Sequence, residues 1–103
     1  MNKYEELYGK AVVVTHISGV RFIARYSGYD VQDDYNDNPV YYYYEFQALE
    51  TDDPRHYICF DINSVDLIEK YEEGMKFTDP EEKVPRLEDD LKKEGFILVG
   101  SPL

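Results

Sequence analysis

Residues 40–49 carry the clearest alternation of apolar and polar positions in the chain, and they predict a β-strand. Successive side chains of a strand point to opposite faces of its sheet. One face is apolar and predicted to be core: Val40, Tyr42, Tyr44, Phe46 and Ala48. The opposite face is mixed: Tyr41, Tyr43, Glu45, Gln47 and Leu49. The two tyrosines of that face either contact a partner or lie under a terminal helix.

Four other segments are rich in β-branched or alternating apolar residues, which favour strands. They predict strands at residues 10–17, 20–29, 56–62 and 65–71. Ser18-Gly19 predicts a tight turn between the first two, and Gly28 predicts a bulge or bend late in the second. Residues 30–39 are rich in Asp and Asn and predict a loop. Asn63-Ser64 predicts a single helical turn or tight bend before the last of these strands.

Both ends of the chain carry helical signals. Residues 2–8 predict a short helix that Asn2 caps and Gly9 ends. A second helix is predicted at about residues 85–94, because Pro85 suits its first position and Gly95 suits its end. Residues 96–99 predict a final strand or a packed extended tail.

Parts of this pattern resemble the Sm-like family of small β-barrels. The residues that resemble the family's first motif are Gly9-Lys-Ala-Val-Val-Val, Gly19-Val-Arg-Phe and Gly28-Tyr-Asp30. Residues 58–68 look like the second half of such a barrel, and the pattern is more loosely similar to SH3-like barrels. Sm-like proteins read RNA with an Asp-x-x-x-Asn element and an Arg/Lys-Gly-Asn element. Here the loop after Asp30 is long and acidic, and residues 60–64 hold no basic residue and no glycine, so the resemblance implies the barrel without the RNA site.

The length and the order of these elements predict one domain. A chain of 103 residues can bury one core without a metal or disulfide. We predict a mainly β (α+β) fold for residues 1–103. Residues 3–71 are expected to form a short N-terminal helix and a small five-stranded antiparallel SH3/Sm-like barrel. Residues 72–103 are expected to add a C-terminal helix and a final strand or extended tail.

The net charge of −11 is larger than solubility requires, and it is unevenly placed. Residues 1–29 hold four basic and two acidic residues, whereas residues 30–103 hold seven basic and twenty acidic residues. Affinity for nucleic acid comes mainly from Lys and Arg at phosphates, so direct binding to nucleic acid is disfavoured. The acidic excess either only solubilises the protein or serves binding to a basic partner.

Few residues offer catalytic or metal-binding chemistry. His16 and His56 have no second ligand at zinc spacing, and no Gly-rich oxyanion turn accompanies any serine. Asp34-x-Asn36-x-Asn38 followed by Glu45 matches a calcium loop, but a proline takes the position of the required glycine, and a plain polar loop is the preferred interpretation. We expect no enzyme activity, no metal and no cofactor.

The compartment is predicted from the single cysteine and the hydropathy. Cys59 has no disulfide partner within the chain, which favours a reducing environment, and a small packed residue is the preferred interpretation of it. No charged-then-apolar leader opens the sequence, and no apolar run approaches the roughly 18 residues of a membrane span. We expect a cytoplasmic protein without membrane contact.

Two groups of acidic residues flank the tyrosine-rich strand and have no basic neighbour to match them. One precedes the strand: Asp30, Asp33, Asp34 and Asp37. The other follows it: Glu50, Asp52 and Asp53. The groups are roughly 30 Å apart along a strand that rises ~3.3 Å per residue. With Tyr41 and Tyr43 between them, they are the predicted partner-binding residues of an extended surface.

These features favour a non-enzymatic, acidic protein-binding module, and in particular an inhibitor that occupies the basic, nucleic-acid-binding surface of a partner protein. In general character the chain resembles small acidic anti-defence proteins of phages and mobile elements, such as anti-CRISPR inhibitors. The alternatives are an Sm-like oligomeric scaffold and a nucleic-acid-binding barrel that uses Lys10, Arg21 and Arg25. The oligomeric state is left open.

Overall fold

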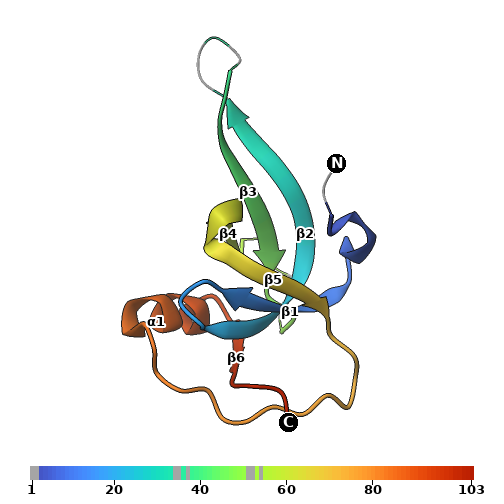
Figure 1. Cartoon of the computed structure of the whole chain (residues 1–103), viewed down its shortest axis with the longest axis vertical. Helices are drawn as coiled ribbons and strands as arrows, with labels where there is room; N and C mark the ends of the chain where they lie inside the picture. The colour runs from blue at the N-terminus through green and yellow to red at the C-terminus, as the bar shows by residue number, and fades with distance from the viewer. Residues whose placement is uncertain (1–2, 34–35, 37, 51–52, 54) are drawn as a thin grey trace.

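The computed structural model describes residues 3–33, 36, 38–50, 53 and 55–103, and within them the protein is mainly β. One six-stranded antiparallel sheet is joined by an α-helix near the C-terminus (Figure 1). The strands are β1 (Ala11–His16), β2 (Arg21–Asp33), β3 (Pro39–Gln47), β4 (Tyr57–Asp61), β5 (Val65–Lys70) and β6 (Ile97–Val99). The helices are the 3₁₀ turns η1 (Glu5–Leu7) and η2 (Ile62–Ser64) and the α-helix α1 (Pro85–Lys93).

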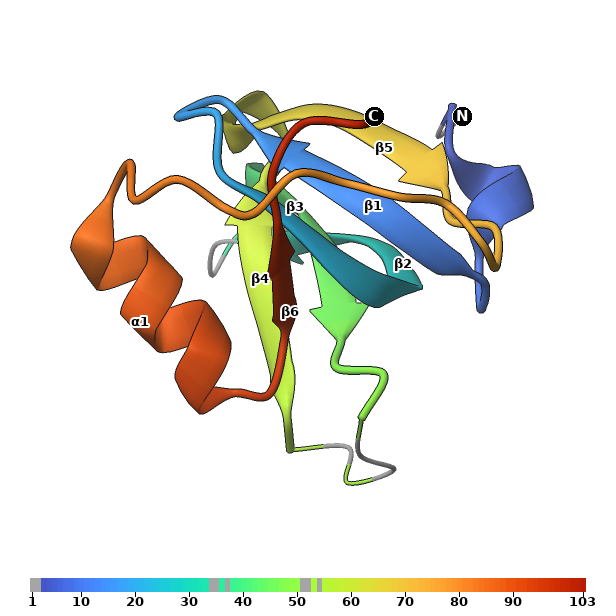
Figure 2. The same ribbon diagram turned by 90° about the horizontal axis from the view of Figure 1, so that it is seen from below.

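The sheet is built on β2, which pairs with three other strands. Its inner half pairs with β1, from Thr15 opposite Arg21 to Ala11 opposite Arg25, and also with β6. Its outer half pairs with β3, beginning at Arg25 opposite Gln47. The strand order is therefore β4-β3-β2-β1-β5, with β6 beside the inner half of β2 (Figure 2).

The turn signals of the sequence are confirmed. The Gly19 N–H donates to the carbonyl of His16 (2.8 Å) and closes the β1–β2 turn, with Gly19 at a φ of 92°. The register of β2 against β3 shifts between Tyr26 and Gly28, which is the predicted bulge, and Gly28 has a φ of 118° that favours glycine. The 3₁₀ turn η2 lies between β4 and β5 as predicted.

The prediction of a loop over residues 30–39 is wrong at both of its ends. β2 continues to Asp33 and β3 already begins at Pro39. Asp30, Val31 and Gln32 pair with three successive tyrosines of β3. Asp and Asn favour turns locally, but cross-strand pairs with aromatic residues stabilise a ladder, and these pairs outweigh the local preference.

The core is an aromatic cluster on the inner face of the sheet. Phe22 is fully buried and meets Phe46 and Phe96 edge to face, at ring-centroid distances of 5.7 and 5.4 Å. Tyr44 and Phe46 of β3 and Ala48 just after it are buried, as predicted for that face. The side chain of Val40 lies outside the described ones. Aromatic pairs in this geometry add about 0.5–1.5 kcal/mol each beyond their buried area.

The C-terminal segment packs as a helix followed by a strand, as predicted. α1 begins at Pro85, and the buried carboxylate of Glu88 accepts the backbone N–H groups of Lys83 and Val84 just before it. Leu91 is fully buried in the core. Gly95, at a φ of 88°, then turns the chain so that β6 pairs with β2.

The N-terminal helix is shorter than predicted. It is the single 3₁₀ turn η1, and a helical segment of three residues depends on packing for its stability. The ring of Tyr4 packs edge-on against Tyr44, with centroids 5.7 Å apart, and this contact fixes the turn to the sheet.

The five-stranded barrel is not confirmed. The sheet has six strands in the described residues, and its path is open: β4 pairs with β3 and β5 pairs with β1, with no pairing between β4 and β5 there. The structure confirms the coarser prediction of a mainly β fold with one antiparallel sheet and one C-terminal helix.

Gly28 offers a test of the bulge. A Cβ at Gly28 would lie 3.2 Å from the Tyr8 ring, and a side chain at this positive φ is strained. We expect Gly28→Ala to lower the free energy of unfolding by about 1–3 kcal/mol. Gly74→Ala is the matched control, because Gly74 also has a positive φ but open space around its Cβ position. Urea unfolding measures both, and equal losses would contradict packing of Tyr8 on Gly28.

His16 makes the β1–β2 turn sensitive to pH. Burial lowers the pKa of His16 from its usual 6.5. Its Nδ1 accepts the Ser18 N–H (3.1 Å) and lies 2.8 Å from the Ser18 hydroxyl oxygen. The neutral ring is therefore the form that accepts the Ser18 N–H within the turn.

The unfolded chain takes up this proton near pH 6.5, whereas the folded chain resists it until lower pH. The stabilisation is complete above pH 6.5 and is lost as the pH falls through the lower, folded pKa. We expect His16→Asn to remove part of the loss of stability between about pH 7.5 and about pH 5, as measured by urea unfolding. An unchanged pH dependence in His16→Asn would contradict the assignment.

Candidate binding surface

The outer parts of β2 and β3 form a two-stranded ribbon that projects from the rest of the sheet (Figure 1). In the described residues, β1 pairs with β2 only as far as Arg25, and β4 pairs with β3 only from Tyr43 inward. Among the described residues, residues 29–33 of β2 therefore have strand partners only in β3, and residues 39–42 of β3 have strand partners only in β2. We call these residues, with Tyr43 at the root, the arm. It lies along the longest dimension of the molecule, 46 Å against 29 and 26 Å.

One face of the arm carries the tyrosines predicted to bind a partner. Tyr41 and Tyr43 are partly exposed and stack on each other, with centroids 5.3 Å apart and ring planes at 23°. Asp30 of β2 and Asp61 of β4 lie directly opposite Tyr43, one on each side. Opposite residues of an antiparallel pair share a face, so both carboxylates border the tyrosine stack. We call this the acidic face.

The electrostatics of the acidic face follow from these neighbours. Desolvation and then the charges of Asp30 and Glu45 raise the pKa of Tyr43 above its usual 10.0. Desolvation and then the charge of Asp61 raise the pKa of Tyr41. Both phenols therefore stay neutral at physiological pH, in a negative potential that favours a cation from outside.

The other face of the arm carries a second tyrosine pair. Tyr29 and Tyr42 stack with centroids 5.9 Å apart and planes at 18°, and Val31 lies opposite Tyr42. The exposed fractions of Tyr29 and Tyr42 are 42% and 38%. The prediction that Tyr42 is core is wrong, because β3 extends beyond the body of the sheet and leaves nothing there to cover the ring. We call this the aromatic face.

A groove of about 1070 Å³ lies at the root of the aromatic face. Its lining is dominated by tyrosine and includes Tyr8, Tyr26, Tyr29 and Tyr44, with Lys3 and Ile62. Gly28 is one of its lining residues, and the absence of a side chain there lets the Tyr8 ring approach the backbone of β2. The groove therefore extends the aromatic face toward η1.

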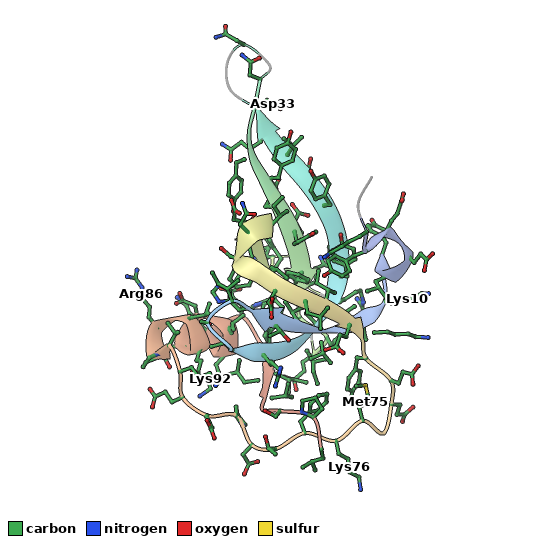
Figure 3. The ribbon with its side chains drawn as sticks, in the orientation of Figure 1. Lys10, Asp33, Met75, Lys76, Arg86 and Lys92 are labelled. Atoms are coloured by element: carbon green, nitrogen blue, oxygen red, sulfur yellow. The ribbon has the colours of Figure 1, made fainter. Side chains whose placement is uncertain are left out.

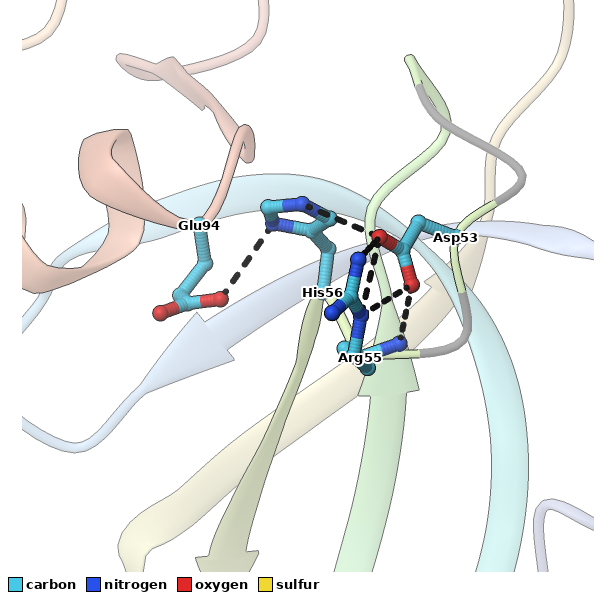
Figure 4. A network of polar contacts seen from close by, with 4 residues as sticks. All are labelled: Asp53, Arg55, His56 and Glu94. Carbon is cyan, nitrogen blue, oxygen red and sulfur yellow. Dashed lines mark hydrogen bonds and ion pairs between the residues drawn. The ribbon is translucent and has the colours of Figure 1, made fainter.

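The second predicted acidic group does not join the arm. Asp53 lies beyond the other end of β3, where Arg55 donates to both of its oxygens, the shortest contact being 2.8 Å. These hydrogen bonds lower the pKa of Asp53 from its usual 3.8. The ring of His56 lies 3.8 Å from Asp53 and 3.5 Å from Glu94, so this network ties the turn to the end of α1 (Figure 4).

The remaining predicted residues divide between the two ends of β3. Asp33 lies at the outer end of the arm (Figure 3). Glu50 is exposed and lies beyond the inner end of β3. Asp34, Asp37 and Asp52 lie outside the described residues. Of the predicted set, the structure therefore gathers Asp30, Tyr41 and Tyr43 into one surface with Asp33 farther out, and it separates Glu50 and Asp53 from them.

Sequence reasoning missed four members of this surface: Tyr29, Tyr42, Glu45 and Asp61. A signal for Glu45 is present in the chain, because residues 26–54 hold eight acidic residues and no Lys or Arg, whereas Asp61 lies outside that stretch. Figure 3 shows the labelled cations Lys10, Lys76, Arg86 and Lys92 around the body, and Asp33 at the end of the arm. The arm therefore has no basic side chain of its own, whereas the body carries charges of both signs.

Other chemistry is sparse in the part of the chain that the structure describes. It contains no group of three His, Cys, Asp or Glu side chains that can hold a metal ion. Burial, and then the charge of Glu45, raise the pKa of the Cys59 thiol, which disfavours the reactive thiolate. The described helices include none that is long and apolar enough to cross a membrane.

Comparison of the chain with protein-family models, characterised proteins and solved structures finds no match in any of the three. Function is therefore inferred from the geometry and charge of the surface alone.

The raised pKa of Tyr43 offers a test of the acidic face. We expect Asp30→Asn to move this pKa back toward 10.0, though not fully, because desolvation is the larger cause. Asp33→Asn is the matched control, since Asp33 is not among the groups that shift Tyr43. Titration of the tyrosine ring resonances by NMR measures the effect. A pKa that is identical in the wild-type and Asp30→Asn proteins would contradict the cross-strand placement.

Proposed function

We propose that this protein is a non-enzymatic, acidic binding module that occupies the basic, nucleic-acid-binding surface of a partner protein. The observation that carries the proposal is the arm, which presents stacked tyrosines bordered by the carboxylates of Asp30 and Asp61. No basic residue lies between Arg25 and Arg55 to neutralise it.

Each component has a physical role in this proposal. Carboxylates held on a paired ribbon take the place of phosphates opposite Lys and Arg of the partner. Tyrosines bury large areas at low cost in side-chain entropy, which makes them common at protein interfaces. An acidic surface without basic residues also steers association with a basic partner, so binding is fast and weakens as salt is added.

The described residues favour binding over catalysis. The Cys59 thiol has a raised pKa, and the Nδ1 of His16 is already used in the β1–β2 turn. Neither group is poised as a nucleophile or general base. A small acidic inhibitor of this kind fits the general character of phage and mobile-element anti-defence proteins such as anti-CRISPR inhibitors, acting in the cytoplasm.

A second candidate is an oligomeric scaffold related to Sm-like barrels. Its support is the strand order β4-β3-β2-β1-β5, the bent β2, and the 3₁₀ turn between β4 and β5. Open edges at β4 and β5 can pair with another copy. Asp66 and Glu69 lie along β5, however, and in a chain of net charge −11 they oppose self-association. Sedimentation velocity separates the two candidates: a monomer favours the binding module.

The proposal predicts salt-sensitive capture of nucleic-acid-binding proteins. The chain is immobilised, exposed to a nuclease-treated lysate of its native host at low salt, and eluted with DNA or RNA. We expect retained proteins that nucleic acid releases. The double variant Asp30→Asn/Asp61→Asn should bind them about two- to thirtyfold more weakly, at about 0.2–1 kcal/mol for each exposed charge pair.

The control removes the same charge elsewhere. Asp89→Asn/Asp90→Asn changes two exposed carboxylates on α1 and should leave binding unchanged. Equal losses in both double variants would show a mere net-charge effect and overturn the assignment of the arm. Retained proteins that nucleic acid cannot release would overturn the proposed class of partner.

A further inference from the structure

The two tyrosine stacks of the arm lie on opposite faces of a ribbon only two strands wide. Tyr41 and Tyr43 occupy the acidic face, and Tyr29 and Tyr42 occupy the aromatic face. Monomeric proteins seldom leave large apolar surface exposed without a use for it. A flat partner surface can cover only one of these faces, whereas a cleft can cover both.

The backbone edges of the arm are poorly suited to pairing with a strand of the partner. The N–H of Val31 donates to the carboxylate of Asp30 (2.8 Å), so this backbone donor is already engaged. Charged side chains on exposed strands are a common device against edge-to-edge pairing. The available recognition elements are therefore rings and carboxylates, which act through the faces.

We propose that the arm inserts into a basic cleft of its partner that otherwise holds single-stranded nucleic acid, and that both tyrosine stacks contact the walls of that cleft. This inference rests on the proposed function and specifies its binding mode and class of partner. The partner's chemistry is set by charge complementarity, since residues 29–45, which include the arm, carry five acidic residues and no basic ones.

The stacked rings favour a single-strand site over a duplex site. Channels for single strands combine a basic groove with aromatic side chains on which bases stack. Tyr41 and Tyr43 have nearly parallel planes, at 23°, and carboxylates beside them, so they offer both the ring face and the negative charge of a nucleotide. Proteins that bind duplexes contact phosphates and base edges, and they leave bases stacked inside the helix. On a surface that binds a duplex, exposed tyrosine rings therefore have no stacked base to replace.

The dimensions of the arm are compatible with insertion. Paired strands lie about 4.8 Å apart, and sheets pack about 10 Å apart face to face. A cleft that admits a two-stranded ribbon therefore needs a width of about 10 Å between its walls. Beyond Tyr43 in the described residues, β4 no longer pairs with β3, so the arm is free of the body over its outer length.

The test uses two defined probes. One is a purified OB-fold single-strand-binding protein loaded with fluorescent oligothymidylate, and the other is a purified helix-turn-helix protein loaded with its labelled duplex. Displacement of each label at low salt is followed by fluorescence anisotropy. We expect the wild-type chain to displace the single strand and to leave the duplex bound.

Variants of the two faces then test insertion. Tyr41→Ala/Tyr43→Ala and Tyr29→Ala/Tyr42→Ala should each raise the concentration needed for half-displacement by about tenfold or more, because loss of aromatic stacking at a base site has effects of this size. Ile17→Ala/Tyr57→Ala is the control, because it removes two exposed side chains outside the arm. It should change the concentration needed for half-displacement by less than about twofold. Circular dichroism checks folding. Single Tyr41→Thr and Tyr42→Thr variants keep strand propensity if a double variant unfolds.

The outcomes separate the inference from the proposed function. An effect confined to one face overturns insertion, as does displacement of the duplex alone. Failure to displace the label from both probes also overturns it. Capture of proteins that nucleic acid releases, tested independently in the lysate experiment, would leave the proposed function standing in each of these cases.

Discussion

The bulge at Gly28 is the constraint on which the rest of the structure depends. It divides β2 into an inner half that belongs to the core and an outer half that leaves it. The inner half holds Phe22 at the centre of the aromatic cluster, between β1 and β6. The outer half runs on with β3 into the arm. A positive φ and the close approach of Tyr8 make glycine the residue that permits this bend.

This arrangement makes the tyrosines of the arm serve two purposes. An isolated two-stranded ribbon is only marginally stable in water. Cross-strand contacts stabilise it, and the stack of Tyr29 on Tyr42 supplies one between β2 and β3 on the aromatic face. On the acidic face, Tyr41 and Tyr43 stack on each other along β3. In the proposed complex the same rings contact the partner, so binding uses side chains whose order is already maintained by the fold. Such preorganisation lowers the entropy lost on association.

The fold could be predicted from the sequence where local signals and tertiary packing agree. The turn at Ser18-Gly19, the bulge at Gly28 and the helix starting at Pro85 follow from glycine and proline, which act on their own backbone. The extension of β2 and β3 through residues 30–33 and 39–42 could not, because the aspartates favour a turn locally while the ladder depends on tyrosines across the sheet. The open path between β4 and β5 likewise depends on long-range geometry.

The candidate surface could likewise be predicted from the sequence only in part. Strand alternation placed Tyr41 and Tyr43 on one face with Glu45, and the structure keeps them there. Alternation also assigned Tyr42 to the core, because a period of two distinguishes faces but not how far the body of the sheet extends along a strand. The pairing of Asp61 with Tyr43 brings β4 into the surface, and no local feature of residues 57–61 indicates that register.

The central claim is that the arm, and not the body, meets a basic nucleic-acid-binding surface. Amide chemical-shift mapping of the isotope-labelled chain, with an unlabelled single-strand-binding protein at low salt, tests it most directly. We expect shifts and broadening concentrated in residues 29–33 and 40–43, and their reversal when single-stranded DNA is added. Perturbations centred on β5 or α1, or perturbations that DNA leaves unchanged, would contradict the claim.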